Sequence, residues 1–452
     1  MNGYDLVVKN GRVFLPGGVV GDLNVGIKQG RIAVLTTDAI SGKEEIDAEG
    51  QSVIPGVVDS HTHCWRGSEF ETMANAGRAA AKGGVTTIID MPVDRPIPST
   101  PKILNEKIAE GESGCLVDFA LQAGVGLDGL EGFSQILEAP VVGAKLFMDN
   151  TPPIGKYRCS DTGEILEALK IIAAADKVAC IHCEDTFIID RLTEEILAKG
   201  RRDPLSFAES RPPVSEYAGI ERTLALIAHT GCRSVIAHIS IPEGIDAVTR
   251  LRRQGAPVFA ETCPHYLLFT TEDMAKDQRL KYKPPNRDRD RVEALWDRLK
   301  QGRLHLVGSD HAPLQKDTTL DIWDISGGVG NMLEVMLPLT ATEAVENRGF
   351  GLDQIVKTLC ENPARIYGLY PRKGCIQPGS DGDLVILNET ERSTIDPEQL
   401  SMIVPPYSVF EGRRVSMRPD TVIVRGKVVV RNKRIVSDAP WGRFVPAGKY
   451  AM

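Results

Sequence analysis

Six polar side chains close five short apolar runs of this 452-residue chain, and five of them, four histidines and an aspartate, are of types that ligate metal ions. The six are His61, His63, Lys145, His182, His238 and Asp310. Neutral imidazoles and carboxylates are the groups that divalent transition metals take as ligands. His61 and His63 lie two residues apart, so on a β-strand they face the same side and can reach one ion together. The pattern predicts a hydrolase built around two metal ions.

The elements that must position these side chains are eight apolar runs, which alternate with helical stretches. The runs cover residues 56–63, 85–92, 116–124, 141–148, 178–185, 234–240, 257–264 and 304–313. Strands that alternate with helices predict a parallel sheet, and eight of them close a (β/α)8 TIM-like barrel of the α/β class. The six candidates end the first, fourth, fifth, sixth and eighth runs. Barrel enzymes carry their active sites at this carboxyl-terminal face.

The two ends of the chain have a different texture from this central region. Short β-like runs are broken by Asn-Gly, Gly-Gly and Gln-Gly turns near the amino terminus, and similar runs return near the carboxyl end. We expect residues 1–53 and 374–452 to form a small β-sandwich with a tail, beside a barrel at 54–373. The segments 151–161 and 313–331 are long and rich in turns, and they are candidate lids.

Composition and charge limit the classes of partner. The chain is 42% hydrophobic and 25% charged, which is ordinary for a globular protein. Its net charge of −8 argues against nucleic acid or an anionic membrane as the main partner. No apolar stretch approaches the roughly 20 residues of a membrane-spanning helix, and the amino terminus has no signal-peptide pattern.

The nine cysteines predict reduced thiols and a cytoplasmic location, because their number is odd and most lie inside apolar runs. Cys180 and Cys183 form a C-x-x-C pattern. Positions three apart on a strand face opposite sides, so we expect them to pack in the core rather than to form a redox or zinc pair.

An ordered set of motifs runs along nearly the whole chain. It comprises PG-V-D-x-H-x-H, G-x-K, H-C-E, A-H-I-S, E-T-C-P-H-Y and S-D-H-A-P, followed by NPARIYGLYPRKGCIQPGSDGDLVI. In this order they resemble the amidohydrolase superfamily, and within it the cyclic-amide hydrolases: allantoinase, hydantoinase, dihydropyrimidinase and dihydroorotase. As a set the motifs are highly specific, whereas each alone is weak.

The resemblance implies two divalent metal ions, expected to be Zn2+, held by the six side chains. His61, His63 and Asp310 would hold the more buried ion, and His182 and His238 the more exposed one. Lys145, N-carboxylated by CO2, would bridge both. A free ammonium cannot ligate a cation, whereas an N-carboxylate offers two oxygens and a negative charge.

The resemblance also assigns roles in the reaction. Asp310 would be the catalytic acid–base group, which takes the proton of the attacking hydroxide and passes it to the leaving nitrogen. The exposed ion would polarise the scissile carbonyl and stabilise the oxyanion. His265 is expected to support the site without binding metal, and His311 to face away from Asp310.

The residues expected to contact substrate depart from each branch of the family. Lys283 stands before Pro-Pro, where allantoinases and hydantoinases usually have serine and dihydroorotases have asparagine. An ammonium there favours a substrate with a carboxylate or several carbonyls, unless the side chain turns to solvent. Arg66 and Arg95 lie near positions where dihydroorotases bind the substrate, and they slightly strengthen this hypothesis.

Three further positions bear on the branch. Asn150 replaces the tyrosine that hydantoinases carry five residues beyond the bridging lysine, and Tyr157 could substitute only if its loop folds back. Leu314 replaces a histidine of dihydroorotases, which weakens that assignment. Gly328 lies in GGVGN, which resembles the glycine-rich loop whose backbone contacts the substrate ring in allantoinases.

Allantoinase or an L-hydantoinase-like enzyme is the best branch match, so we expect hydrolysis of a small cyclic amide with a five-membered ureide ring preferred. Allantoin leads, hydantoin follows closely, and dihydroorotate is third. Two other classes stay open: a non-catalytic scaffold relative without metals, and a metal-dependent hydrolase of linear amides or amidines. Metal analysis and ring-opening assays separate these classes. Because relatives are commonly tetramers, a homo-oligomer, tetramer or dimer, is also expected.

Overall fold

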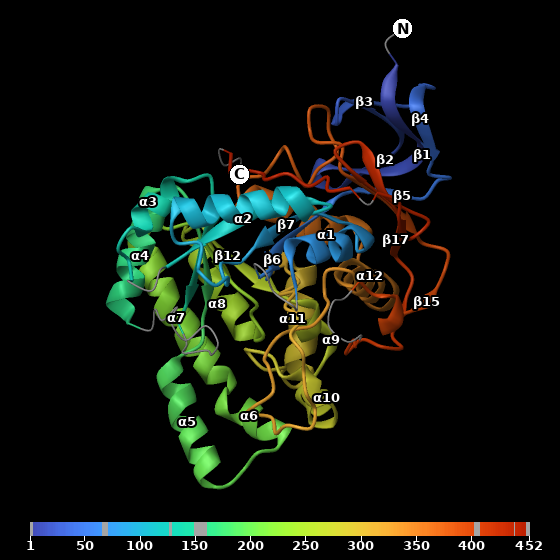
Figure 1. The fold of residues 1–452 in the computed structure, drawn as a ribbon. Helices are drawn as coiled ribbons and strands as arrows, with labels where there is room; N and C mark the ends of the chain where they lie inside the picture. Colours follow the sequence, from blue (N-terminus) through green and yellow to red (C-terminus); the bar gives the residue numbers. More distant parts are fainter. Residues whose placement is uncertain are drawn as a thin grey trace.

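The computed structural model describes residues 3–65, 71–125, 129–148, 161–401, 407–437 and 439–448. In it an α/β barrel lies beside a strand-rich unit built from an early and a late segment of the chain (Figure 1). The fold class expected from the sequence is therefore confirmed. The domain boundaries at residues 53 and 373 stay a prediction.

Eight parallel strands form the barrel, in the order in which they occur along the chain. They are β6 (Val57–Thr62), β7 (Val85–Asp90), β8 (Asp118–Gly124), β9 (Gly143–Phe147), β10 (Val178–His182), β11 (Ser234–Ile236), β12 (Val258–Thr262) and β13 (Leu306–Val307). A parallel bridge between Thr62 and His311 brings the first and last strands together. Each strand coincides with one of the eight apolar runs.

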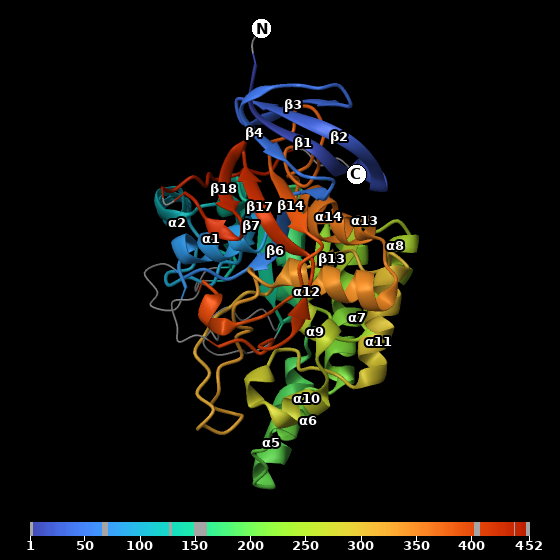
Figure 2. The same cartoon turned by 90° about the vertical axis from the view of Figure 1, so that its right-hand side faces the viewer.

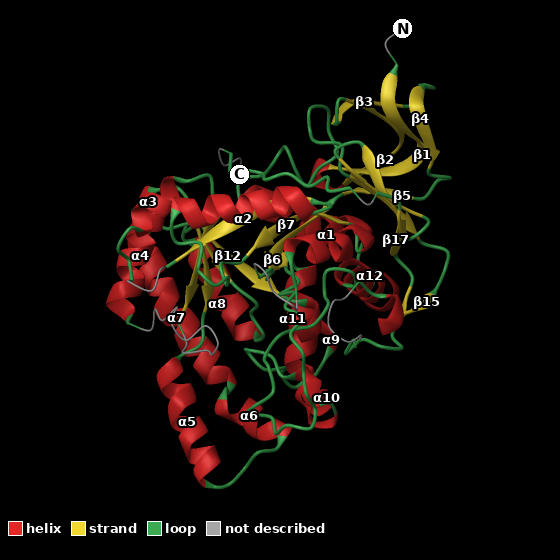
Figure 3. Cartoon of the chain, in the orientation of Figure 1, coloured by secondary structure: helices red, strands yellow, loops and turns green. Residues whose placement is uncertain are grey.

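Helices surround these strands (Figure 3). The α-helices are α1 (Met73–Lys82), α2 (Pro101–Gly114), α3 (Phe133–Glu138), α4 (Thr162–Ala174), α5 (Thr186–Ala198), α6 (Pro204–Ser210), α7 (Pro213–Thr230), α8 (Pro242–Arg253), α9 (Pro264–Leu268), α10 (Thr271–Lys276), α11 (Arg289–Lys300), α12 (Met336–Thr342), α13 (Leu352–Val356) and α14 (Asn362–Ile366). Several begin at a side-chain cap; Asp185, for example, accepts from the backbone N–H groups of Phe187 and Ile188 at α5. None of the described helices is both long and apolar enough to cross a membrane.

Shorter helical turns complete the connections. They are the 3-10 turns η1 (Pro16–Gly18), η2 (Gln278–Leu280) and η5 (Pro397–Gln399), and the π-helical turns η3 (Glu343–Asn347) and η4 (Lys357–Glu361).

The barrel interior is a packed core. Each of the eight strands, or the residue just before it, contributes one buried apolar side chain to a single cluster: Val58, Ile89, Ala120, Val142, Val178, Val235, Phe259 and Leu306. Ile366, Tyr367 and Leu369, at and after α14, pack on the same cluster. The interior is therefore filled by an apolar layer, and the side chains at the carboxyl ends of the strands lie above it.

Both ends of the chain pair in one nine-stranded sheet. Its strands are β1 (Tyr4–Leu15), β2 (Val19–Lys28), β3 (Arg31–Thr36), β4 (Gly42–Asp47), β5 (Ser52–Pro55), β14 (Leu384–Asn388), β17 (Arg418–Val424), β18 (Lys427–Arg431) and β19 (Arg434–Ile435). β5 joins the two halves, because it pairs with β1 on one side and with β14 on the other. Figure 2 shows the early and late strands side by side. A separate pair, β15 (Ser393–Thr394) and β16 (Arg414–Val415), lies between β14 and β17 in sequence.

A buried cluster of charges links this sheet to the barrel. The Lys373 ammonium, wholly buried, forms ion pairs with Asp118, Asp381 and Asp383. Asp118 begins β8 and also pairs with the Arg425 guanidinium, which follows β17. The cluster therefore ties the amino-terminal end of a barrel strand to the strand-rich unit.

Candidate metal centre and active site

The six candidate ligands all lie at the carboxyl-terminal end of the barrel. His61 is in β6 and His63 follows it; Lys145 is in β9, and His182 ends β10. His238 and Asp310 lie two and three residues beyond the ends of β11 and β13. Five of the six side chains are buried and Asp310 is partly exposed. The strands thus bring together groups that lie up to 249 positions apart in the sequence.

His61, His63 and Asp310 form the first cluster, and their ligand atoms lie within 4.8 Å of one another. The Asp310 Oδ1 atom lies 3.0 Å from His63 Nε2 and 3.4 Å from His61 Nε2. Two imidazole nitrogens and a carboxylate oxygen therefore converge on one point, which is a donor set that suits a divalent transition metal.

His182 and His238 form a second pair beside this cluster. His182 Nδ1 lies 3.1 Å from His238 Nε2, and the two rings meet edge-on with their centroids 4.6 Å apart. The His238 ring is also 5.3 Å from that of His61. The two groups of ligands are therefore neighbours in one site.

Lys145 lies beside these candidate ligands, with its Nζ atom 5.2 Å from the centre of the Phe147 ring. Its side chain is 1% exposed, and its Nζ atom is 3.4 Å from His61 Nε2 and 3.9 Å from Cys180 Sγ. Among the described residues no carboxylate is within ion-pair distance of Nζ. A buried amine without a carboxylate partner, beside the candidate metal ligands, fits a lysine that is N-carboxylated and could bind cations.

The electrostatics of the ligands also fit a metal. Burial lowers the pKa of His63 to about 4, and burial together with His182 lowers the pKa of His238 well below its usual value. Burial opposes ionisation of Asp310, but His61 and His63 outweigh it and hold the pKa of that carboxyl well below its usual range. Metal ligation requires neutral imidazoles and an ionised carboxylate.

Two of the candidate ligand residues have an unusual backbone. His238 has φ of 40° and Asp310 has φ of 50°, in the left-handed region that non-glycine residues seldom adopt. Such strain persists only where the surrounding structure enforces it, and it concentrates at functional sites. Here Asp59 contributes, because its Oδ1 accepts from the backbone N–H of Ser309, next to Asp310, at 2.8 Å.

The structure also shows two contacts of the candidate ligands that the sequence analysis missed. Glu261 Oε1 lies 2.7 Å from His61 Nδ1, and Glu184 Oε2 lies 2.9 Å from His182 Nε2. Strand alternation could have indicated Glu184, because it lies two residues beyond His182. Nothing in the spacing indicates that Glu261, on β12, reaches past β13 to His61 on β6.

An apolar wall, also missed, adjoins the ligands. Met91, Val93, Phe147, Cys180 and Ala237 form a buried cluster at the carboxyl ends of the strands, and Trp65 packs against it. The Trp65 indole stacks on His63 with centroids 6.2 Å apart, and the Phe147 ring lies 6.2 Å from that of His182. The site therefore has an apolar surface on one side.

Two histidines outside the ligand set differ in their bonding. His311 donates from Nε2 to Glu71 at 2.9 Å and accepts from the backbone N–H of Met332 at 3.1 Å, so it faces away from the cluster. His265 is wholly buried between the rings of Tyr266 and Tyr282, with no hydrogen-bond partner among the described residues.

The expected substrate-contacting residues are placed unevenly. A Cβ atom built on Gly328 would lie 2.4 Å from the carbonyl oxygen of Ala312, so only glycine fits against the chain that follows Asp310. The Lys283 side chain is half-buried, and its Cε would lie 3.6 Å from a Cβ on Gly327. Lys283 therefore lies beside the glycine loop that contains Gly328. Arg95 is exposed after β7, whereas Arg66, Asn150 and Tyr157 lie outside the described residues.

Two lysines form hydrogen bonds between the candidate lid 313–331 and the segment around Lys281. Lys281 Nζ donates to the carbonyl oxygens of Trp323 and Ile325 at 3.1 and 2.7 Å. Lys316, within the segment, donates to the carbonyl oxygen of Lys281 at 2.9 Å. These bonds hold the glycine loop beside Lys283. Most of the other candidate lid, 151–161, lies outside the described residues.

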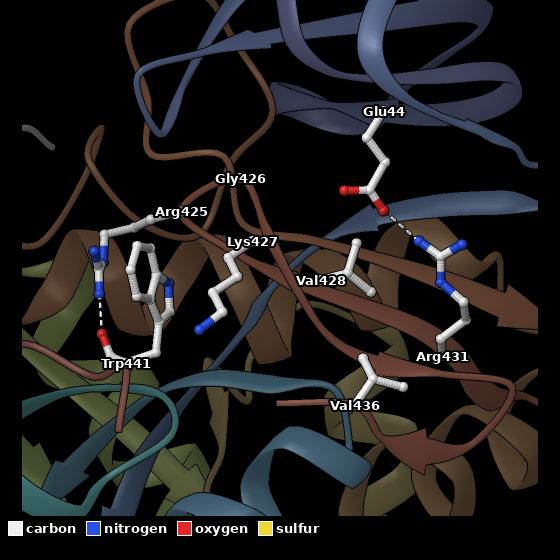
Figure 4. Close-up of a pocket in the computed structure, with 8 residues that line it drawn as sticks. All are labelled: Glu44, Arg425, Gly426, Lys427, Val428, Arg431, Val436 and Trp441. Atoms are coloured by element: carbon white, nitrogen blue, oxygen red, sulfur yellow. Dashed lines mark hydrogen bonds and ion pairs between the residues drawn. The ribbon is translucent and has the colours of Figure 1, made fainter. Parts of the chain in front are cut away.

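A separate cavity of about 440 Å3 lies at β18, in the strand-rich unit (Figure 4). Arg425 and Lys427 lie 4.6 and 4.7 Å from the centre of the Trp441 indole, and Arg431 pairs with Glu44. Arg425 also pairs with Asp118, at the amino-terminal end of β8. The cavity is therefore on the opposite side of the barrel from the ligand cluster.

Comparison with known proteins gives full-length matches. The model of the amidohydrolase family matches residues 52–429. The chain is 33% identical over 460 residues to an L-hydantoinase of Paenarthrobacter aurescens, covering 99% of each chain. It is 32% identical over 461 residues to an allantoinase of Salmonella choleraesuis strain SC-B67, covering 98% of each. The solved structure of L-hydantoinase (dihydropyrimidinase) from Arthrobacter aurescens matches with a TM-score of 0.93 and 32% identity, over 98% of this chain and 100% of that chain.

Proposed function

Because this chain belongs to the amidohydrolase family, we propose that it is a metal-dependent enzyme that opens a five-membered ureide ring. The expectation of a cyclic amidohydrolase is confirmed by the full-length likeness to an L-hydantoinase and an allantoinase. The observation that carries the finer proposal is the convergence of His61, His63 and Asp310 beside the buried Lys145.

In this proposal two divalent ions, expected to be Zn2+, occupy the site. His61, His63 and Asp310 would hold one ion, and His182 and His238 the other. The Lys145 amine would add to CO2, forming an N–C bond and releasing a proton, and the resulting carboxylate would bridge the ions. When bound, the ions supply Lewis acidity to the substrate carbonyl and make hydroxide available near neutral pH.

The side chains of the protein then carry the proton and hold the ring. Hydroxide adds to the ring carbonyl carbon, the C–N bond breaks, and the ring nitrogen takes up a proton. Asp310 accepts the proton of the attacking hydroxide and delivers it to the leaving nitrogen. Its partial exposure beside buried histidines suits this role, because the carboxylate can reach the substrate.

Lys283 and the glycine loop would select the ring. The backbone at Gly328 lies beside the chain that follows Asp310, where it can contact ring carbonyls or amides, and the Lys283 ammonium would favour a ring with several carbonyls. Leu314 packs at Gly328. Because dihydroorotases have a histidine at the position of Leu314, dihydroorotate is the weakest of the three candidates. Allantoin and 5-substituted hydantoins remain the leading pair.

We also propose a cytoplasmic homo-oligomer, a tetramer or dimer. The eight described cysteines are buried and unpaired, which is typical of a reducing compartment. The charge of −8 supports a small-molecule substrate rather than nucleic acid or a membrane surface.

A substrate panel tests the proposed function. Zinc-loaded protein, expressed with bicarbonate, is assayed on allantoin, 5-substituted hydantoins, dihydrouracil, dihydroorotate and linear amides. We expect ring opening of a five-membered ureide, lost on chelation and restored by zinc. Hydrolysis of linear amides alone, or fewer than one metal equivalent per chain, would refute the proposal.

A further inference from the structure

Two wholly buried glutamates lie behind the candidate ligands, and each contacts a different histidine. Glu261 is on β12 and Glu184 follows β10; both have 0% exposure. We propose that they are positioning residues that hold His61 and His182 in opposite tautomers, so that each glutamate controls one of the two ion sites. This inference rests on the proposed function only in naming metal ions as the groups bound.

The geometry around Glu261 fixes the orientation of His61. A carboxylate only accepts hydrogen bonds, so at 2.7 Å from Glu261 Oε1 the His61 Nδ1 atom carries the hydrogen. The lone pair is then on Nε2, which faces Asp310 Oδ1 at 3.4 Å. Ser60 Oγ donates to the other oxygen of Glu261 at 2.5 Å, and the backbone N–H of His238 approaches Oε1 at 3.4 Å. These contacts hold the carboxylate in place.

The geometry around Glu184 holds His182 in the opposite tautomer. Here Nε2 faces the carboxylate at 2.9 Å and carries the hydrogen. The lone pair is therefore on Nδ1, which faces His238 Nε2 at 3.1 Å. Arg211 Nη1 also donates to the same Glu184 oxygen, at 2.5 Å. A neutral imidazole carries one hydrogen, so each glutamate directs the free nitrogen toward the ligand cluster.

Because the two glutamates contact different histidines, each should affect the metal affinity of a different ion site. Outer carboxylates that orient metal-binding histidines typically contribute 10–100-fold in metal affinity. Glu261 bonds to a histidine of the first cluster, and Glu184 to one of the second pair. Loss of either carboxylate should therefore weaken one ion site about 10–100-fold, and the weakened site should differ between the two variants.

The test compares Glu261→Gln and Glu184→Gln with Glu216→Gln as matched control. Glu216 is also buried and paired with an arginine, Arg287, but it bonds to Ser240 and to no candidate ligand. Zinc affinity is measured by competition with a chelator. Ring tautomers are measured in metal-free protein from nitrogen-15 spectra of labelled histidine. Both readouts are independent of catalysis.

We expect each ligand-side variant to bind one equivalent of zinc about 10–100-fold more weakly and to lose one histidine tautomer signature, a different one in each. The Glu216→Gln variant should keep both. Wild-type affinity and tautomers in the two ligand-side variants, or equal zinc loss in the control, would overturn the inference. A wild type that binds two zinc ions but opens no ring would refute the proposed function alone.

Discussion

Replacement of Gly328 by alanine tests whether the glycine loop sets the position of the substrate. The new Cβ would lie 2.4 Å from the Ala312 carbonyl oxygen, about 1 Å short of the 3.4 Å at which ordinary contact begins. Because the obstacle is backbone, the loop must move by about this amount away from Asp310. A misplacement of about 1 Å can cost roughly 100-fold in rate, and overpacking typically costs about 1–3 kcal/mol of stability.

The adjacent Gly327→Ala variant is the matched control. Its Cβ would meet only the flexible end of Lys283, at 3.6 Å or more, which is ordinary contact. We expect Gly328→Ala to lower kcat/KM for the preferred ureide about 100-fold with zinc content unchanged. Gly327→Ala should stay within a few-fold in kcat/KM and within about 1 kcal/mol in urea unfolding. Equal kcat/KM for the wild type and Gly328→Ala, or an equal loss in both variants, would refute the reasoning.

Three further changes probe other parts of the molecule. Lys145→Ala should reduce bound zinc and bring the rate to background, with partial recovery on adding acetate or propionate; unchanged zinc content and rate would contradict the carboxylated bridge. Lys283→Ser should alter the order of kcat/KM among allantoin, a 5-substituted hydantoin and dihydroorotate, and an unaltered order would show that its ammonium does not select the ring. Lys373→Met removes the cation that three buried aspartates share. Asp118 keeps its pair with Arg425 and Asp381 its pair with Arg372, but Asp383 keeps no ion-pair partner among the described residues, so urea denaturation should show a loss of about 3–5 kcal/mol. The exposed pair of Lys170 and Glu167 provides its control, because Lys170→Met should change stability little.

The barrel was predictable because its strands are buried on both faces and appear as separate apolar runs. The gathering of the six candidate side chains at one end of the barrel was predictable as well, because the ordered motifs and the ends of the strands agree; their binding of metal stays a prediction. The local backbone at His238 and Asp310 was not predictable. Both lie beyond their short strands with positive φ, and an apolar run does not encode a left-handed turn.

The carboxylates that contact the candidate ligands could not be predicted from the sequence either. Glu261 and His61 are 200 positions apart, and their contact depends on closure of the sheet, which leaves β13 between β12 and β6. The exposure of Arg95 illustrates the same limit, since its loop position alone does not say where the side chain points. Pairings across the barrel come from tertiary structure, whereas residue type and strand periodicity come from local sequence.

The way β5 joins both ends of the chain constrains synthesis on the ribosome. β5 ends at Pro55, and its partner β14 begins at Leu384. At about 5–20 residues per second, the roughly 330 residues between them take on the order of 15–65 s to translate. Throughout that interval one edge of β5 has no partner strand, so a nascent-chain chaperone that shields this edge would raise the yield of correctly folded protein.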